Sequence, residues 1–340
     1  MNLSVAPLPP PEATRLLRAL EEAVGGTVLG QTEVIREVLC CVAGGGHALL
    51  EGPPGVGKTL LVRALSHAAG LELSRIQFTP DLLPADVTGT DVLLEGPEGR
   101  TFRFQPGPLF GQLVLADEVN RATPRTQSAL IEAMAEGTVS VGGTGHALPR
   151  PFTVLATQNP IEHEGTFPLP EAQLDRFLLK IEIRSPDEAD LVRILSRTDR
   201  ERPDLPAPVT DAAGVRGLIA TARGVPIPDP LLRQIARVVR ATDPTYGTSA
   251  ARRSLRMGAS PRGGEAMCRV ARVRALLEGR AHVVAEDLAW ALRPTLRHRL
   301  LPSFEAEARG LVGDALVADV LHDLPELPPE VERVLEAIEG

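Results

Sequence analysis

Eight consecutive residues at 52–59 carry the clearest chemical signal of the sequence. They read GPPGVGKT and match the pattern G-x-x-x-x-G-K-[ST]. Glycines in this run permit backbone dihedrals that are closed to other residues, so successive N–H groups can turn inward on an anion at the positive end of the following helix. The Lys58 ammonium would reach the β- and γ-phosphates of a nucleotide, and the Thr59 hydroxyl would bind Mg²⁺. The residues that we expect around the phosphates are Gly52, Pro53, Pro54, Gly55, Val56, Gly57, Lys58, Thr59 and Leu60.

Two adjacent carboxylates, Asp117 and Glu118, follow the apolar run LVLA at 113–116. Acids that follow an apolar strand downstream of such a loop are typical of the Walker B arrangement of nucleotide hydrolases. Asp117 would bind Mg²⁺, and Glu118 would be the base that orients and deprotonates the attacking water. Adjacent residues of a strand point to opposite faces, so the two acids should have separate tasks. The alternative is a solvated turn after a strand.

Short apolar runs place both motifs within an α/β fold. The run HALLE at 47–51 predicts a buried strand before the glycine-rich loop, and apolar residues repeat at helical spacing after it. Residues 73–78 and 152–157 predict two further strands, and the second is followed by Gln158 and Asn159. Ligands bind at the carboxyl ends of strands in open α/β sheets, so Asn159 is a candidate site residue.

A turn between two predicted amphipathic helices, around 16–24 and 34–42, contains Gly30 and Gln31. This turn could touch a nucleotide base, and an ordinary helix connection explains it equally well. Residues 79–110 are rich in proline and glycine and contain a possible hairpin around 95–99.

A second hairpin is predicted with arms at 138–141 and 146–151 around a glycine-rich loop. The segments 79–110 and 138–151 are candidates for contact with a partner, or simple spacers.

Composition narrows the class of protein. The net charge is −8 and the sequence pI is about 5.5, so no overall positive field attracts nucleic acid or an anionic membrane. Aromatic residues make up only 3%, which disfavours a base-stacking surface. Three cysteines fit a reducing compartment. The first residues lack the pattern of a signal peptide, and no run approaches the ~18 apolar residues of a membrane span, so we expect a cytoplasmic protein without membrane insertion.

Five segments, in their order and approximate spacing, resemble the MoxR family of AAA+ ATPases over essentially the whole chain. They are GPPGVGKT, LADEVNRA, ATQNP, EGTFPLPEAQLDRF and GASPRG. The resemblance implies an α/β P-loop NTPase core, with a parallel sheet flanked by helices, and a small C-terminal all-α lid. We expect the core at 1–185 and the lid at 186–340, with the boundary at a capping-box-like sequence that begins at Ser185.

The resemblance also implies roles for three polar residues. Asn159 is similar to the sensor 1 residue that positions the hydrolytic water. Arg176 is similar to the arginine finger that enters a neighbouring subunit's site, where a fixed positive charge suits the transferring phosphoryl group. A salt bridge to Asp175 or Glu171 is the alternative for Arg176.

Arg262 resembles the sensor 2 residue. Ser260 and Pro261 suit the start of a helix, which places the Arg262 charge in a first turn that disfavours cations. A phosphate of ATP would explain that charge, and so would an acidic neighbour.

These assignments predict a Mg²⁺-dependent ATPase that closes into a ring. By resemblance the ring is a hexamer that remodels or matures protein clients, often with a protein carrying a von Willebrand factor A domain. Two other hypotheses remain. One is a nucleic-acid motor or loader on the same fold, which the acidic balance disfavours. The other is a nucleotide switch that does not hydrolyse ATP, which the complete set of candidate catalytic residues disfavours.

Overall fold

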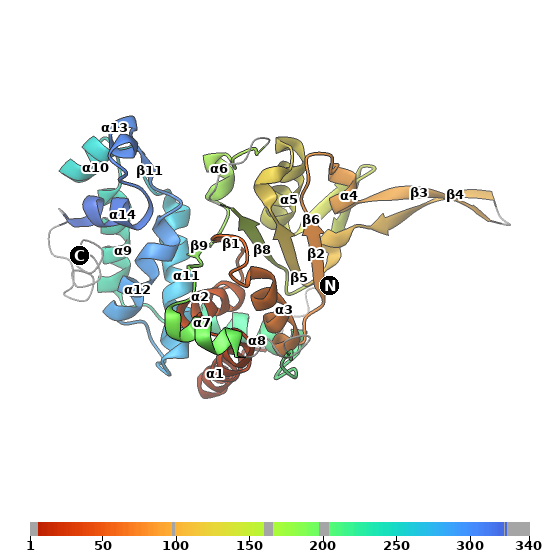
Figure 1. Ribbon diagram of the computed structural model, residues 1–340, viewed down its shortest axis with the longest axis horizontal. Coiled ribbons are helices and arrows are strands. Elements are labelled where there is room, and N and C mark those ends of the chain that lie inside the picture. Colours follow the sequence, from red (N-terminus) through yellow and green to blue (C-terminus); the bar gives the residue numbers. More distant parts are fainter. Residues whose placement is uncertain (1–5, 97–98, 160–165, 197–203, 323, 325–340) are drawn as a thin grey trace.

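A five-stranded parallel sheet forms the centre of the molecule (Figure 1). The computed structural model describes residues 6–96, 99–159, 166–196, 204–322 and 324. The strand order is β2-β5-β8-β1-β9, and Leu50 of β1 lies opposite both Thr157 and Ile181. The strands are β1 (Ala48–Glu51), β2 (Leu73–Gln77), β5 (Leu113–Asp117), β8 (Thr153–Gln158) and β9 (Leu179–Glu182). The predicted α/β fold class is confirmed.

Helices cover both faces of this sheet, so its strands are apolar on both sides. Alternate residues point to opposite faces. Leu50 and Leu115 therefore join one buried cluster, and Leu49 and Val114 join another. Helices of the first cluster are α1 (Pro10–Thr27), α2 (Thr32–Ala43), α3 (Lys58–Ala69) and α8 (Ala212–Gly224). Those on the other face are α4 (Pro84–Thr88) and α5 (Pro124–Glu136).

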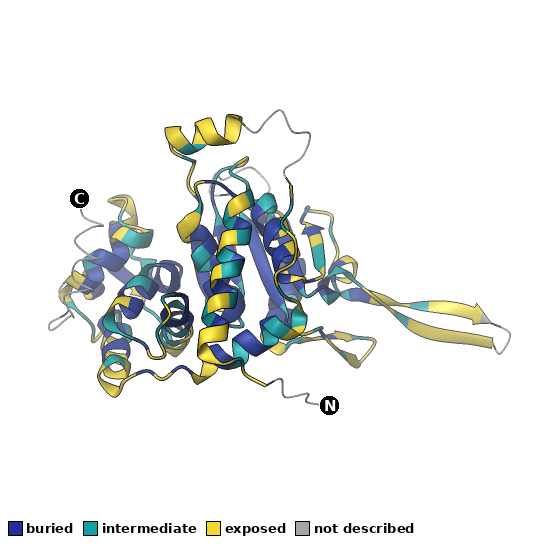
Figure 2. Ribbon diagram, turned by 90° about the horizontal axis from the view of Figure 1, so that it is seen from below, coloured by how far each residue is buried: buried dark blue, intermediate teal, exposed yellow. Residues whose placement is uncertain are grey.

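Two antiparallel hairpins extend from the core. The first pairs β3 (Gly89–Gly96) with β4 (Gly99–Pro106), which confirms the predicted hairpin, and it reaches well beyond the body of the molecule (Figures 1 and 2). The second pairs β6 (Thr138–Val141) with β7 (Thr144–Ala147). Short 3₁₀ turns η1 (Pro108–Phe110) and η2 (Val119–Arg121) flank β5.

The second hairpin is shorter than predicted. Its turn is Gly142-Gly143, with φ of 57° and 81°, which is the geometry that joins two strands most tightly. Its second arm stops at Ala147 rather than reaching 151. Pro149 and Pro151 have no N–H to donate to a ladder, so the strand cannot continue through them.

A C-terminal helical unit packs around a third buried cluster, which confirms the predicted lid. Its members are α9 (Asp229–Ala241), α10 (Ser249–Ser254), α11 (Pro261–Leu277), α12 (Ala285–Leu296), α13 (Phe304–Ala308) and α14 (Gly313–His322). A small pairing of β10 (Leu255–Met257) with β11 (Leu301–Pro302) adds strands to a lid predicted to be all helical. No helix in the described part of the chain is both long and apolar enough to cross a membrane.

The segment that follows β9 differs from the prediction in its helix start. Helix α7 (Glu188–Leu195) begins after Asp187, whose Oδ1 accepts a 2.8 Å hydrogen bond from the Asp190 N–H. Asp187, among the most favourable capping residues, therefore takes the position expected for Ser185. Helix α8 lies beyond residue 185 but shares the buried cluster of α1, α2 and α3. The boundary at 185 stays a prediction.

Candidate functional site

The glycine-rich loop joins β1 to α3 and opens onto a cavity of about 360 Å³ at the carboxyl edge of the sheet. Gly55 and Gly57 have φ of 84° and 89°, a region that side chains avoid. The cavity brings together the loop and the ends of β5 and β8. Its lining residues are Pro54, Gly55, Gly57, Lys58, Thr59, Leu60, Asp117, Glu118, Thr157 and Asn159. The loop, the paired acids and Asn159 therefore share one cavity.

Lys58 lies folded over the loop that precedes it. Its Nζ donates to the carbonyl oxygens of Gly52 at 2.5 Å and Pro53 at 3.2 Å. Burial lowers the pKa of Lys58, while the nearby charges of Asp117 and Glu118 act in the opposite direction. The ammonium therefore lies inside the cavity among backbone oxygens, from which an incoming phosphate can draw it.

Asp117 ends β5 and is held from two sides. Its Oδ1 accepts a 2.6 Å hydrogen bond from the Thr157 hydroxyl on the adjacent β8, and its Oδ2 forms a 2.9 Å ion pair with Arg75 on β2. Asp117 is buried. Neighbouring strands thus fix the carboxylate at the mouth of the cavity, facing the loop that carries Thr59.

Glu118 lies just beyond the strand, in a strained conformation. Its φ is 56°, and it is the one non-glycine residue with positive φ in the part of the chain that the structure describes. Such outliers cost on the order of 1–3 kcal/mol and cluster at functional sites. Its N–H donates to the Thr157 hydroxyl at 2.8 Å, and its Oε2 accepts from Gln77 and Arg121, each at 2.9 Å. The carboxylates of Asp117 and Glu118 therefore have separate partners, although both residues contact Thr157, and the turn at Glu118 separates them rather than opposite faces of a strand.

The residues of this cavity fit Mg²⁺ and a nucleoside triphosphate. Thr59 and Asp117 offer the oxygen donors that Mg²⁺ prefers. The loop N–H groups precede the N-terminus of the 12-residue helix α3, which favours anions. The donor set and the positive end of the helix face the same space.

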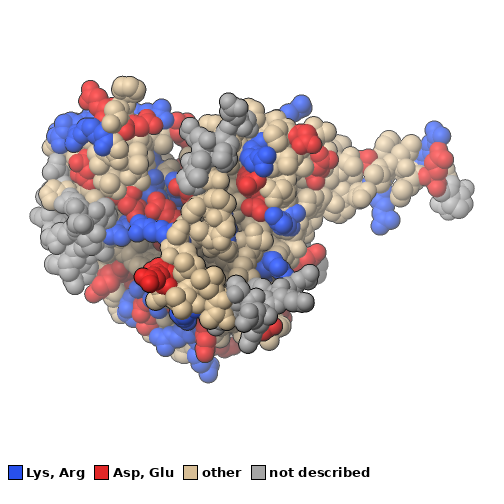
Figure 3. Space-filling view, viewed as in Figure 1, with Lys and Arg blue, Asp and Glu red and all other residues tan. Residues whose placement is uncertain are grey.

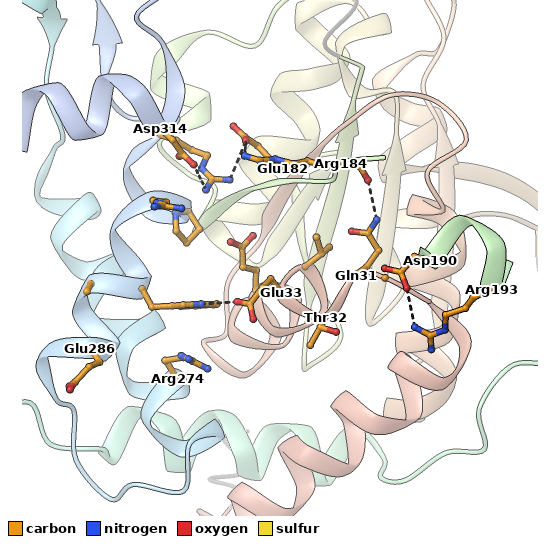
Figure 4. Close-up of a pocket in the computed structure, with 18 residues that line it drawn as sticks. Gln31, Thr32, Glu33, Glu182, Arg184, Asp190, Arg193, Arg274, Glu286 and Asp314 are labelled. Atoms are coloured by element: carbon orange, nitrogen blue, oxygen red, sulfur yellow. Dashed lines mark hydrogen bonds and ion pairs between the residues drawn. The ribbon is translucent and has the colours of Figure 1, made fainter. Parts of the chain in front are cut away.

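Gly30 and Gln31 line a different and larger cavity, of about 920 Å³ (Figure 4). Gln31 lies on one side of it, and Arg274 and Glu286 on the other. The Gln31 side-chain amide donates to the Arg184 carbonyl oxygen at 3.1 Å, and the preceding Ile183 backbone packs against Gly52. The residues after β9 therefore lie between the two cavities. Contact of Gly30 and Gln31 with a base stays a prediction.

Arg176 and Arg262 lie at the opposite edge of the sheet. Both line a cavity of about 730 Å³ together with His47, Phe152 and Leu178, the residues directly before β1, β8 and β9. A four-residue strand spans ~13 Å, so this amino edge is well separated from the glycine-rich loop.

Arg262 has an acidic neighbour, because its NH1 lies 4.0 Å from Oδ2 of Asp175. Contact between Arg262 and a phosphate of ATP stays a prediction. Ser260 caps α11 as predicted, because its hydroxyl accepts from the Arg262 N–H at 3.1 Å.

Arg176 is exposed, and its NH1 donates to the Ile131 carbonyl oxygen at 3.4 Å. The acids that could have paired with it have other partners. Glu171 pairs with Arg256 at 2.8 Å, and Asp175 pairs with Arg299 at 2.9 Å. Both acids are therefore engaged by other arginines, and the role of Arg176 as a finger stays a prediction.

Four residues of the site were missed by the sequence analysis: Arg75, Gln77, Arg121 and Thr157. Arg75 and Gln77 belong to β2, a strand predicted from its apolar pattern, and nothing in that pattern marks them. Thr157 did carry a signal, because it is a hydroxyl at the carboxyl end of a predicted strand, two residues before Asn159.

The strand, glycine-rich loop and helix, with carboxylates at the end of a second strand, define the P-loop nucleotide-binding class. Comparison with known proteins agrees. The family described as "ATPase family associated with various cellular activities (AAA)" matches residues 47–179, and "AAA lid domain" matches 248–320.

Relatives cover nearly the whole chain. Chaperone MoxR1 of Mycobacterium tuberculosis is 39% identical over 91% of this chain and 82% of its own. Protein MoxR of Paracoccus denitrificans is 34% identical over 87% and 92%. A solved structure from Cytophaga hutchinsonii, assigned as an ATPase, has a TM-score of 0.84 at 36% identity, covering 92% of this chain and 95% of that one. This chain belongs to the MoxR family of AAA+ ATPases.

Proposed function

We propose that the protein hydrolyses ATP to ADP and phosphate with Mg²⁺. The observation that carries this proposal is the single cavity shared by the glycine-rich loop, Asp117, Glu118 and Asn159. Mg²⁺, held by Thr59 and Asp117, would supply positive charge to the phosphate oxygens. Lys58 would contact the β- and γ-phosphates, and Asn159 would orient water.

Glu118 is the general base of this proposal. Its Oε2 accepts hydrogen bonds from Gln77 and Arg121, which hold the carboxylate in place. The strained backbone of Glu118 supports a functional role for this position. A carboxylate oxygen of Glu118 would accept the proton of the attacking water.

We propose further that the active form is a ring, by resemblance a hexamer. Arg176 and Arg262 lie across the sheet from the glycine-rich loop of their own chain. Head-to-tail contact would bring that amino edge to the loop edge of the next copy, and repetition of the same contact closes a ring. Both arginines would then act on a neighbour's nucleotide.

The ring would remodel protein clients in the cytoplasm. The name of the mycobacterial relative, a chaperone, supports this role. So does the β3–β4 hairpin, which carries exposed apolar side chains: Phe102 is 76% exposed and Leu93 48%. Positive and negative side chains are interspersed on the face shown in Figure 3, which gives no single-sign track for a nucleic-acid backbone. A partner with a von Willebrand factor A domain is part of the same proposal.

Two purified variants test the proposed site. Glu118→Gln should retain ATP and lose turnover, because the amide keeps the shape of the side chain but cannot accept the proton. Arg176→Ala should lose turnover, by about 10³-fold or more, with little change in ATP affinity. Undiminished hydrolysis in both variants would refute the assignment.

Client capture tests the chaperone role. ATP-loaded Glu118→Gln protein is incubated with lysate of the source cell, with and without nuclease. Proteins retained with ATP, lost with ADP and indifferent to nuclease are the expected result. Retention that depends on nucleic acid would favour the motor hypothesis instead.

A further inference from the structure

A buried arginine of the lid reaches across to the segment that carries Arg176. Arg299 follows the C-terminal end of α12, and its side chain is only 3% exposed. Its Nε donates to Oδ1 of Asp175 at 2.9 Å, and its NH2 donates to the Phe177 carbonyl oxygen at 2.7 Å. The guanidinium therefore binds the residue before Arg176 and the residue after it.

Arg299 and its neighbour His298 make further contacts with the segment at 175–178. The Arg299 NH2 also lies 3.2 Å from the Asp175 carbonyl oxygen, and its NH1 lies 3.3 Å from that of Leu178. Nε2 of the neighbouring His298 is 3.1 Å from the Phe177 carbonyl oxygen. A planar guanidinium with several fixed acceptors leaves little freedom to the backbone that it holds.

A second part of the lid meets the same carboxylate. The Ser260 hydroxyl, at the start of α11, donates to Oδ2 of Asp175 at 2.9 Å. Arg262 lies 4.0 Å from that oxygen. The end of α12 and the beginning of α11 thus converge on Asp175, while Arg176 points into the open cavity at the amino edge.

We propose that Arg299 and Asp175 are positioning residues, which make the place of Arg176 depend on the orientation of the lid. This inference rests on the proposed function of Arg176 as a finger acting on a neighbouring copy. When the lid turns relative to the sheet, the Arg299 contacts carry the segment around residue 176 with it. A lid movement in one subunit therefore changes catalysis in the next subunit rather than in its own.

The structure offers a matched control for Arg299. Arg297 is also buried, with a side chain 6% exposed, and lies two residues away on the same turn of the chain. It pairs with Asp314 within the lid and with Glu182 of β9, so it also joins the lid to the sheet. Both partners of these Arg297 ion pairs lie outside the segment at 175–178. A general loosening of the lid should therefore appear in both Arg299→Met and Arg297→Met. Displacement of Arg176 should appear only in Arg299→Met.

Subunit mixing separates positioning of the finger from damage to the lid. Arg299→Met alone should lose ATP turnover by about 10²-fold, the typical effect of a ~1 Å displacement of a catalytic group, with the apparent KM within about twofold. Glu118→Gln subunits cannot hydrolyse ATP but carry an intact finger. Mixed with Arg299→Met at equal amounts, they should restore about one quarter of the wild-type turnover, as expected for random neighbours in a ring.

Arg176→Ala, mixed in the same way, is the positive control. It should be rescued to the same level, whereas any loss caused by Arg297→Met should persist in its mixture. Asp175→Asn, which keeps the shape of the side chain, serves as a second variant should Arg299→Met fail to fold. Rescue of Arg176→Ala without rescue of Arg299→Met or Asp175→Asn overturns this inference alone. No rescue of Arg176→Ala overturns the shared site, and this inference with it.

Discussion

A single hydroxyl on β8 holds both acids of the candidate site. The Thr157 oxygen donates to Asp117 and accepts from the backbone N–H of Glu118. Thr157 is 1% exposed. The position of Glu118, the predicted base, and the orientation of Asp117, the predicted metal ligand, therefore depend on one side chain that has no role in the proposed chemistry.

Replacement of Thr157 by valine, which has a similar shape, should lower ATP turnover at least ~10-fold while ATP affinity changes little. It should also reduce the free energy of unfolding by about 1–3 kcal/mol, because two buried polar groups lose their partner. Turnover and urea unfolding are the measurements. Thr153→Val, in the same strand and equally buried, is the control, since its side chain has no contact with the acids. Equal effects of the two variants would contradict this role.

His47 makes stability depend on pH. Burial lowers the pKa of His47 to about 4, from an ordinary value of 6.5. The unfolded chain therefore binds a proton that the folded chain does not between those values, and stability is lost as pH falls from 6.5 towards 4. The loss amounts to about 3 kcal/mol.

Unfolding by urea at a series of pH values checks this prediction. His47→Gln should flatten that part of the profile, and His67→Gln, at an exposed position, should leave it unchanged. An identical slope in wild type and His47→Gln would exclude His47 as the cause.

Among individual site residues, the sequence predicted those that belong to contiguous motifs. Lys58, Thr59, Asp117 and Glu118 are recognisable because the chemistry needs fixed residue types at fixed spacing. Arg75 and Gln77 were missed because they act across the sheet, and pairing between strands leaves no local pattern. The place of Arg262 beside Asp175, at the amino edge of the sheet, depends on packing between distant segments and leaves no local pattern. Its contact with a phosphate stays a prediction.

Among the elements, the β3–β4 hairpin is the clearest candidate for client contact. Leu93 and Phe102 are cross-strand partners on one face of it, and both are exposed. Exposed apolar side chains that lie together mark interaction surfaces. Contact with a client would therefore be the main role of this pair.

Replacement of both by serine should leave basal ATP turnover and thermal unfolding unchanged and reduce client capture on the Glu118→Gln background by about tenfold or more. Thr101→Ala, in the same strand but on the opposite face, should keep capture intact. Undiminished capture by the double serine variant would move the client surface elsewhere.

Four strands of the central sheet were predicted individually from short, mostly apolar runs, whereas β9 was not predicted. Their order was not, since the neighbours of β1 lie more than a hundred residues away in the chain. The second hairpin was predicted too long because the glycine loop was interpreted without the effect of the prolines that follow it. The start of α7 was misplaced because two capping residues compete within three positions.

At the scale of the whole molecule, the loop edge and the arginine edge of the sheet are complementary halves of one proposed site. One chain holds both halves but cannot bring them together, because the strands separate them. In the proposed ring, a second copy would supply what the first lacks. Catalysis would then belong to the assembly rather than to a single chain.

The most direct test is ATP turnover per chain as a function of protein concentration, with the mass of the assembly measured by sedimentation in the same buffer with ATP. We predict that turnover per chain falls as the assembly dissociates and that it is recovered on concentration. Turnover per chain that stays constant down to the monomer would contradict the shared site.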